Sequence, residues 1–346
     1  MKRRRRNILI ISSLKENTGN TVLCERIKLR LLDGDDNDEV NGGQPSSTTT
    51  SFTMFDVNKQ GYDQFKSIVD QQQLQLNSNS TTQLGSLVII AVHAYRAGLL
   101  LDTLYGSGGN DYNDIPYILV YGGTDLNEMH KKEEKMTVME RVVERATAIV
   151  CLTQEMMDKS YRLFDRFVGH EPLKAKTAVI FPSVETTHDI SSPSDDDVLK
   201  SILQSDDLYP HPSLSLENNL PIFNSYKKDE INLYLLPSGI RTVKDPTYLL
   251  DSFIKWSNDK LKLKPIDQQY NILLIVGPKL DESFDTLLNQ LQNQGNNNIN
   301  NNNGNVKNSE GVSTCLLEAM DVGVPCVGRI NDGNCAILED EQLFIL

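Results

Sequence analysis

The chain has 346 residues, a formal net charge of −13 and 39% hydrophobic residues. This length is sufficient for two domains with separate cores. The acidic balance argues against nonspecific binding to nucleic acid, whose phosphates a protein neutralises with lysine and arginine. No stretch is long and apolar enough to cross a membrane. The five cysteines show no Cys-x-x-Cys spacing, which favours a cytoplasmic protein with reduced thiols and no disulfide framework.

One basic cluster lies at the start of the chain, where Lys2 and four arginines ending at Arg6 precede the apolar run 8–11. Such a cluster can contact nucleic acid, anionic lipid or an import receptor. We interpret it as the solvated start of the first strand, and weak contact with a membrane surface is the alternative. The apolar run is too short for the core of a signal peptide.

Strands and helices alternate through the first half of the sequence. Expected strands cover residues 7–13, 52–57, 87–91, 115–121, 148–152 and 177–181, and expected helices cover 21–32, 95–104, 135–147 and 154–167. This alternation predicts a parallel sheet with helices on both faces. The Ser/Thr/Asp-rich tract 33–50 and the Gln/Asn/Ser-rich tract 71–83 bury little apolar surface and are predicted as low-complexity insertions.

A second series follows residues 187–230, whose Ser, Asp, Pro and Asn content predicts a linker or a disordered insertion. Expected strands cover 231–236, 271–276 and 325–328, expected helices cover 246–256, 282–292 and 312–320, and an Asn tract lies at 296–305. The α/β pattern thus predicts two Rossmann-like domains, residues 1–186 and 231–346. We expect them to face a cleft, because parallel sheets bind ligands beyond the carboxyl ends of their strands.

Two glutamates, Glu310 and Glu318, flank the start of the last expected helix. In a helix they lie about two turns apart on a similar face. Backbone N–H groups near Gly311 point at an anion there, and the carboxylates can accept hydrogen bonds from sugar hydroxyls. The alternative is a capped surface helix, because acidic residues are common in a first turn.

Two cations, Arg241 and Lys244, follow the first strand of the second series, and so face the predicted cleft. Arginine offers a bidentate fork to phosphate, and lysine offers a point charge. A diphosphate leaving group gains negative charge as a glycosidic bond breaks, so fixed cations stabilise that transition state. The alternative is a pair of solvated loop cations. The acidic runs 33–39 and 195–197 are also interpreted as solvated, so no metal site is predicted.

Segments of both halves resemble the retaining glycosyltransferases of the group-1 family, which have the two-domain GT-B architecture, and within it the glycosyltransferase 1 domain-containing proteins. The matching segments are LLPSGIRTVKDPTYLLDSF, ILLIVGP, EGVSTCLLEAMDVGVPCVGR and DGNCAIL in the second half, and NTGNT, VHAYRAG and GGTDLNE in the first. The resemblance implies transfer of a sugar from a nucleotide-sugar donor to an acceptor with retention and without a metal cofactor. It makes residues 1–186 the acceptor-side domain and residues 231–346 the donor-side domain.

By this resemblance, four residues of the second half bind the donor. Arg241 and Lys244 hold its diphosphate, Glu310 contacts hydroxyls of its sugar, and Glu318 contacts its ribose. Gly311 belongs to the same site through its backbone N–H.

The resemblance also implies roles for three residues of the first half. Gly19, in the first loop between strand and helix, lets the backbone approach the donor. His93, which follows the strand 87–91, faces the donor sugar, and a hydrogen-bonded structural histidine is the equal alternative. Asp125 binds an acceptor hydroxyl or caps the following helix.

The second half departs from the family pattern. The family usually has further strands between the strand 271–276 and Glu310, and closing helices after the strand 325–328. We therefore expect an incomplete second domain, and a noncatalytic nucleotide- or sugar-binding protein of the same fold is the alternative function. A nicotinamide-dependent oxidoreductase is disfavoured, because the first strand leads into Leu-Lys-Glu-Asn-Thr-Gly-Asn and not Gly-x-Gly-x-x-Gly.

Overall fold

The chain forms two compact units. A computed structural model describes residues 4–15, 19–36, 48–78, 84–107, 112–182, 184, 231–237, 249–263, 270–276, 314–321, 326, 334 and 337. The first unit comprises Met1–Val184 and Ser309–Ile345, and the second comprises Glu185–Asn308 with Leu346. The segment 309–345, which we assigned to the second predicted domain, thus clusters with the first unit.

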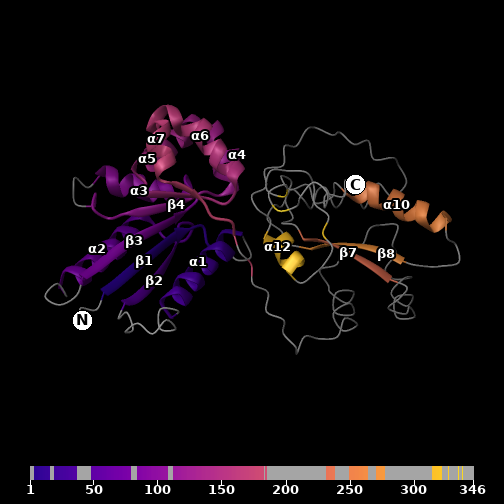
Figure 1. The fold of residues 1–346 in the computed structure, drawn as a ribbon, viewed down its shortest axis with the longest axis horizontal. Helices are drawn as coiled ribbons and strands as arrows, with labels where there is room; N and C mark the ends of the chain where they lie inside the picture. Colours follow the sequence, from indigo (N-terminus) through magenta and orange to yellow (C-terminus); the bar gives the residue numbers. More distant parts are fainter. Residues whose placement is uncertain are drawn as a thin grey trace. The chain divides into compact units, whose positions relative to one another are not determined.

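A parallel sheet of six strands organises the first unit, in the order β2-β1-β3-β4-β5-β6 (Figure 1). The strands are β1 (Arg4–Ser12), β2 (Thr48–Asp56), β3 (Leu84–Val92), β4 (Tyr117–Val120), β5 (Ala148–Cys151) and β6 (Thr177–Val179). The predicted parallel α/β architecture is confirmed for this unit. The order reverses between β1 and β3, because the chain adds β2 on one side of β1 and all later strands on the other.

Both faces of this sheet are apolar. Successive residues of a strand point to opposite faces, and a parallel sheet covered on both sides needs apolar residues at every position. In β1, Leu9 and Ile11 join the larger core cluster, whereas Ile8 and Ile10 join the smaller one. The continuous apolar run 8–11 therefore forms a central strand buried on both faces.

Helices cover the two faces unequally. The larger cluster receives side chains from α2 (Tyr62–Ser78), α3 (Arg96–Ser107), α5 (Glu133–Arg145), α6 (Gln154–Val168) and α7 (His170–Ala175). The smaller cluster receives Cys24, with Leu23 and Ile27, from α1 (Gly19–Asp36), which lies on the opposite side of the sheet from α3 and α5 (Figure 1). The short helices α4 (Gly123–Asn127) and η2 (Met129–Lys131), which we did not predict, follow β4.

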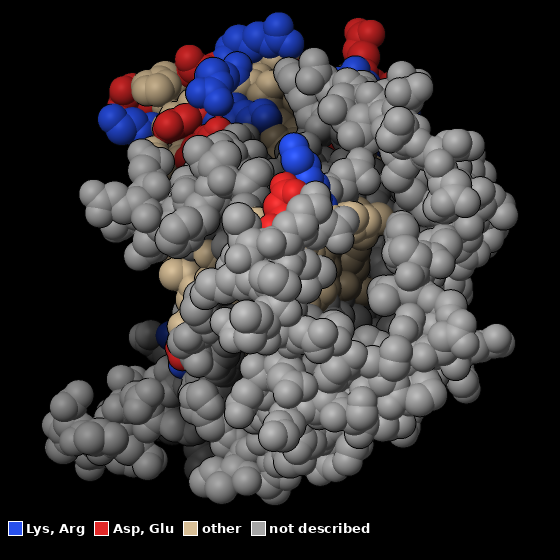
Figure 2. Space-filling model, turned by 90° about the vertical axis from the view of Figure 1, so that its right-hand side faces the viewer, with Lys and Arg blue, Asp and Glu red and all other residues tan. Residues whose placement is uncertain are grey.

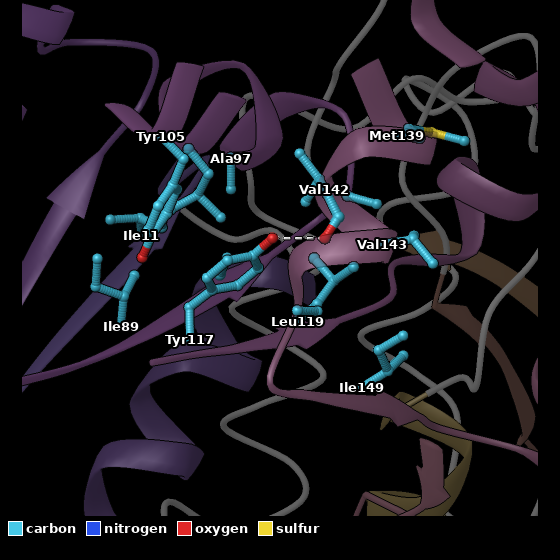
Figure 3. Close-up of a cluster of buried hydrophobic side chains, with 14 of the residues drawn as sticks. Ile11, Ile89, Ala97, Tyr105, Tyr117, Leu119, Met139, Val142, Val143 and Ile149 are labelled. Atoms are coloured by element: carbon cyan, nitrogen blue, oxygen red, sulfur yellow. Dashed lines mark hydrogen bonds between the residues drawn. The ribbon is translucent and has the colours of Figure 1, made fainter. Parts of the chain in front are cut away.

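The contacts of α5 with β4 and with α3 show how tightly the larger cluster is packed. Figure 3 shows the Tyr117 hydroxyl pointing at the Val142 carbonyl, to which it donates a hydrogen bond of 2.5 Å. A Cβ at Gly98 would lie 3.2 Å from Val142 Cγ2. Glycine at position 98 thus allows the two helices to approach closely.

The Gln/Asn-rich tract differs from our prediction. Residues 71–78 continue α2 and are not an insertion. The helix persists because its face towards the sheet remains occupied: the Gln72 amide donates to the Thr53 hydroxyl at 3.0 Å, and Leu76 packs against the larger cluster. At the start of the chain, Arg4–Ser12 forms β1 and Arg6 is exposed, which agrees with a solvated beginning of the first strand.

The second unit contains two parallel strands, β7 (Ile231–Pro237) and β8 (Tyr270–Val276), and the helix α10 (Leu250–Leu263). Tyr234 of β7 packs against Phe253 and Trp256 of α10, with ring centroids 5.4 and 5.6 Å apart. The segment 309–345 contributes α12 (Thr314–Asp321). The predicted helix 282–292 and the strand 325–328, apart from Cys326, lie outside the described residues.

No helix in the described part of the chain is long and apolar enough to cross a membrane. On the face drawn in Figure 2, described basic and acidic side chains lie beside one another at the top of the view. Charges of both signs are therefore interspersed on this part of the surface.

Candidate functional site

The carboxyl edge of the six-stranded sheet places several sequence-predicted residues together. Open parallel sheets bind ligands at the point where the strand order reverses, which here lies between β1 and β3. Ser13 follows β1 and Gly19 begins α1, while His93 follows β3 and Arg96 begins α3. Asp125 lies in α4, directly after β4.

His93 has an unusual backbone and a buried ring. Its φ is 85°, a left-handed conformation that costs a residue with a Cβ about 1–2 kcal/mol. Only 1% of the residue is exposed. Its Nε2 lies 2.9 Å from the Thr124 hydroxyl, and its Nδ1 contacts Asp125 Oδ1. Both ring nitrogens are thus engaged within the protein.

The carboxylate of Asp125 fixes the backbone around His93. Its Oδ2 accepts backbone N–H groups of Ala94 at 2.7 Å and Gly122 at 2.9 Å, and the residue has no exposed surface. Its Oδ1 accepts no hydrogen bond from the described residues and lies against Nδ1 of the His93 ring. The carboxylate therefore links the end of β3 to the start of α4.

The tautomer of His93 follows from these contacts. The backbone N–H of Arg96 donates to Nδ1 at 3.2 Å, which requires that nitrogen to be unprotonated. In a neutral ring the proton is then on Nε2, which donates to the Thr124 hydroxyl oxygen at 2.9 Å. The contact of Nδ1 with Asp125 Oδ1 is not a hydrogen bond.

For His93 and Asp125 the sequence left two alternatives, contact with a ligand or a structural role. His93 occupies the predicted strand end but has the contacts of a hydrogen-bonded structural histidine. Asp125 makes the contacts of a helix cap, because it accepts the N–H of Gly122 where α4 begins. The predicted roles towards a donor sugar and an acceptor hydroxyl remain predictions.

A more open cluster lies at the ends of β1 and β2. The Ser13 hydroxyl accepts hydrogen bonds from the Asn58 amide at 2.5 Å and from Arg96 Nη1 at 3.3 Å. The buried Asp56 accepts the backbone N–H groups of Leu14 at 3.1 Å and Asn58 at 3.0 Å through Oδ1. Arg96 is exposed, unlike His93 three residues before it. This cluster therefore presents a cation at the edge of the sheet.

The beginning of α1 leaves room near the same edge. No other described residue lies within 4 Å of a Cβ built on Gly19, and the Thr21 hydroxyl donates to the Lys15 carbonyl at 2.7 Å. Gly19 is the first residue of α1 and not part of the preceding loop, and its predicted role towards a donor stays a prediction. The thiols of Cys24 and Cys151 are buried, and burial raises the pKa of Cys24 to about 11 and the pKa of Cys151, at the end of β5, to about 12, which disfavours the thiolate form.

Glu318 is the one predicted donor-binding residue of the second half that is described. It lies on α12, and its carboxylate forms an ion pair of 2.5 Å with Arg26 of α1. Arg241, Lys244, Glu310 and Gly311 lie outside the described residues. Within the described part of the chain, no group of three or more His, Cys, Asp or Glu residues is placed to hold a metal ion.

The geometry adds residues that the sequence analysis did not single out. Ser13 and Asn58 are polar residues just after strand ends, and Thr124 lies in the short helix α4, so none of them carries a sequence signal of its own. Arg96 had a signal, because it lies in the segment VHAYRAG, three residues after His93 and beyond a strand end. This signal is weak, because lone cations at helix starts are common.

Comparison with known proteins finds relatives of this chain. No family model matches. The chain is 28% identical to glycosyltransferase 1 domain-containing protein 1 of Xenopus tropicalis over an alignment of 279 residues, which covers 75% of this chain and 69% of the relative. This similarity supports a relationship to the glycosyltransferase 1 family. Because three quarters of the chain is more than the first unit contains, the similarity includes residues of both units.

Proposed function

We propose that this protein is a glycosyltransferase of the retaining GT-B type, which transfers a sugar from a nucleotide-sugar donor to an acceptor in the cytoplasm. The observation that carries the proposal is the similarity to a glycosyltransferase 1 domain-containing protein over 75% of the chain. The first unit supports it, because its parallel sheet has a strand-order reversal whose edge carries Gly19, His93 and Arg96. A parallel sheet alone would not, since one fold supports many functions.

In the proposed reaction, an acceptor oxygen attacks the anomeric carbon from the face that the leaving group occupies. The carbon–oxygen bond to the diphosphate breaks, and the leaving phosphate takes the acceptor proton, so no protein base is required. Arg241 and Lys244 stabilise the charge on the diphosphate. Glu310 and the backbone N–H of Gly311 position the donor, and Glu318 binds its ribose.

The proposed roles of the two cations are tested by nucleotide binding. A thermal-shift panel of nucleoside diphosphates and nucleotide sugars identifies the nucleotide, because a ligand that binds only the folded state raises its stability. The double variant Arg241→Ala, Lys244→Ala should weaken binding of that nucleotide by at least tenfold in calorimetry. The control is Arg162→Ala, Lys174→Ala, which removes two exposed cations from α6 and α7. Equal affinity of the wild type and the Arg241/Lys244 variant would reject the phosphate assignment.

A noncatalytic nucleotide- or sugar-binding protein is the second candidate. The specific observation in its favour is that His93 is buried with both ring nitrogens engaged and that Glu318 is paired with Arg26. Hydrolysis of the bound nucleotide sugar separates the two candidates. Release of free sugar that Glu310→Gln abolishes supports the enzyme, whereas tight binding without release supports the second candidate.

A further inference from the structure

One ion pair joins two helices that lie far apart in the sequence. Arg26 is on α1, about two turns after Gly19, and its Nη2 donates to Oε1 of Glu318 on α12 at 2.5 Å. Both helices belong to the first unit. Glu318 is the residue to which the proposed function gives the donor ribose, so Arg26 holds a member of the proposed donor site.

The sequence of α1 offers Arg26 no acidic partner within its own helix. Side chains three and four residues apart share a helix face. The positions three and four residues from Arg26 hold Val22, Leu23, Leu29 and Arg30. The preceding Glu25 pairs with Lys28 at 3.8 Å. Among the residues that the structure describes, Glu318 is therefore the one acceptor of the Arg26 guanidinium.

The ion pair uses one oxygen of the Glu318 carboxylate. Within the described part of the chain Oε2 has no partner, and 41% of the Glu318 side chain is exposed. The Arg26 side chain is 23% exposed, and its Nη1 is buried and donates to none of the described residues. Protein thus encloses one end of the guanidinium, while the other end holds Oε1 and leaves Oε2 to a ligand.

We propose that Arg26 is a positioning residue for the donor ribose, which holds the Glu318 carboxylate so that Oε2 accepts a hydrogen bond from a ribose hydroxyl. This inference rests on the proposed function, from which it takes the ribose. A carboxylate only accepts hydrogen bonds, and each ribose hydroxyl supplies a donor. A glutamate that an arginine already holds loses fewer conformations on binding than a free one. A partly exposed ion pair adds little to the stability of the fold, so its main consequence is the orientation of Glu318.

Matched nucleotides test this assignment by calorimetry on the full chain. The probes are ADP, GDP and UDP, each with its 2′,3′-dideoxy analogue, which keeps the base and the diphosphate and lacks both ribose hydroxyls. We expect the wild type to bind one ribonucleotide about tenfold or more tightly than its analogue, because the analogue makes no hydrogen bond to the carboxylate. Glu318→Ala should abolish this preference.

Arg26→Ala should weaken binding of the ribonucleotide by about two- to tenfold, because a free glutamate must be ordered on binding. It should leave binding of the dideoxy analogue unchanged. Arg26→Lys should restore most of the preference, since an ammonium group can also hold Oε1. In the Glu318→Ala background, Arg26→Ala should have no further effect, because Arg26 acts through that carboxylate. The control is Arg30→Ala, which removes an exposed arginine from the same helix and should leave the preference unchanged.

Three outcomes overturn the assignment and leave the proposed function standing. An unchanged preference in Arg26→Ala, or an equal loss of both nucleotides, would make the ion pair a purely structural contact. Equal binding of ribonucleotide and analogue to the wild type would remove the ribose from Glu318. If none of the nucleotides binds the wild type, the proposed function fails and this inference fails with it. If Arg26→Ala reduces the preference while Arg241→Ala, Lys244→Ala changes nothing, the phosphate assignment fails and the role of Arg26 remains.

Discussion

The two halves of the carboxyl edge differ in how their polar groups are used. Between β3 and β4, His93 and Asp125 are buried, and the carboxylate, the ring and two backbone N–H groups engage one another. At the ends of β1 and β2, Asn58 donates to the Ser13 hydroxyl, which also accepts the one side-chain hydrogen bond that the exposed Arg96 donates within the described part of the chain. The first half fixes the backbone, and the second half leaves a charge available. Polar residues at a strand end can therefore support a site or contact a ligand, and burial distinguishes the two.

The largest expected effect is on the buried half. Asp125→Ala removes the acceptor of the Ala94 and Gly122 N–H groups and leaves both buried without a partner. We expect a loss of about 3 kcal/mol in the free energy of unfolding, measured by urea titration. The control is Asp102→Ala, whose carboxylate pairs with the exposed side chain of Arg141 and should contribute less than about 1 kcal/mol. Equal losses in the two variants would contradict the supporting role of Asp125.

A smaller effect on the free energy of unfolding distinguishes the role of the His93 backbone conformation from that of its ring. His93→Ala and His93→Gly remove the same hydrogen bonds, but only glycine adopts a φ of 85° without strain. The glycine variant should be more stable by about 1 kcal/mol in urea unfolding. The same pair of changes at Thr137, exposed within α5, should give the opposite order, because glycine is unfavourable inside a helix. A less stable glycine variant at position 93 would show that the left-handed backbone is not required there.

The smallest expected effect is on the exposed half. Arg96→Ala should change the free energy of unfolding by no more than about 0.5 kcal/mol, since one exposed contact of 3.3 Å is lost. The urea midpoint and slope should both match those of the wild type. A loss as large as that of Asp125→Ala would mean that Arg96 supports the fold, and the two halves would not differ as described.

The parallel α/β character of the first unit was predictable from sequence. The apolar runs 8–11 and 87–91 bury both faces of a strand, and only a sheet covered on both sides requires such runs. The Gln-rich continuation of α2 was not predictable from composition, because Gln72 reaches Thr53 of β2, which only the folded chain brings near.

By itself, the sequence determined which residues follow strand ends, because local apolar periodicity sets the strands and parallel pairing aligns their carboxyl ends. His93, Asp125 and Arg96 could all be placed at one edge in this way. Only the tertiary structure decided which of them face inward. Asp125 is buried because its carboxylate accepts two backbone N–H groups, those of Ala94 and Gly122, which need an acceptor, whereas Arg96 is exposed at the first position of α3. Burial depends on neighbours distant in sequence, and spacing along one chain does not encode it.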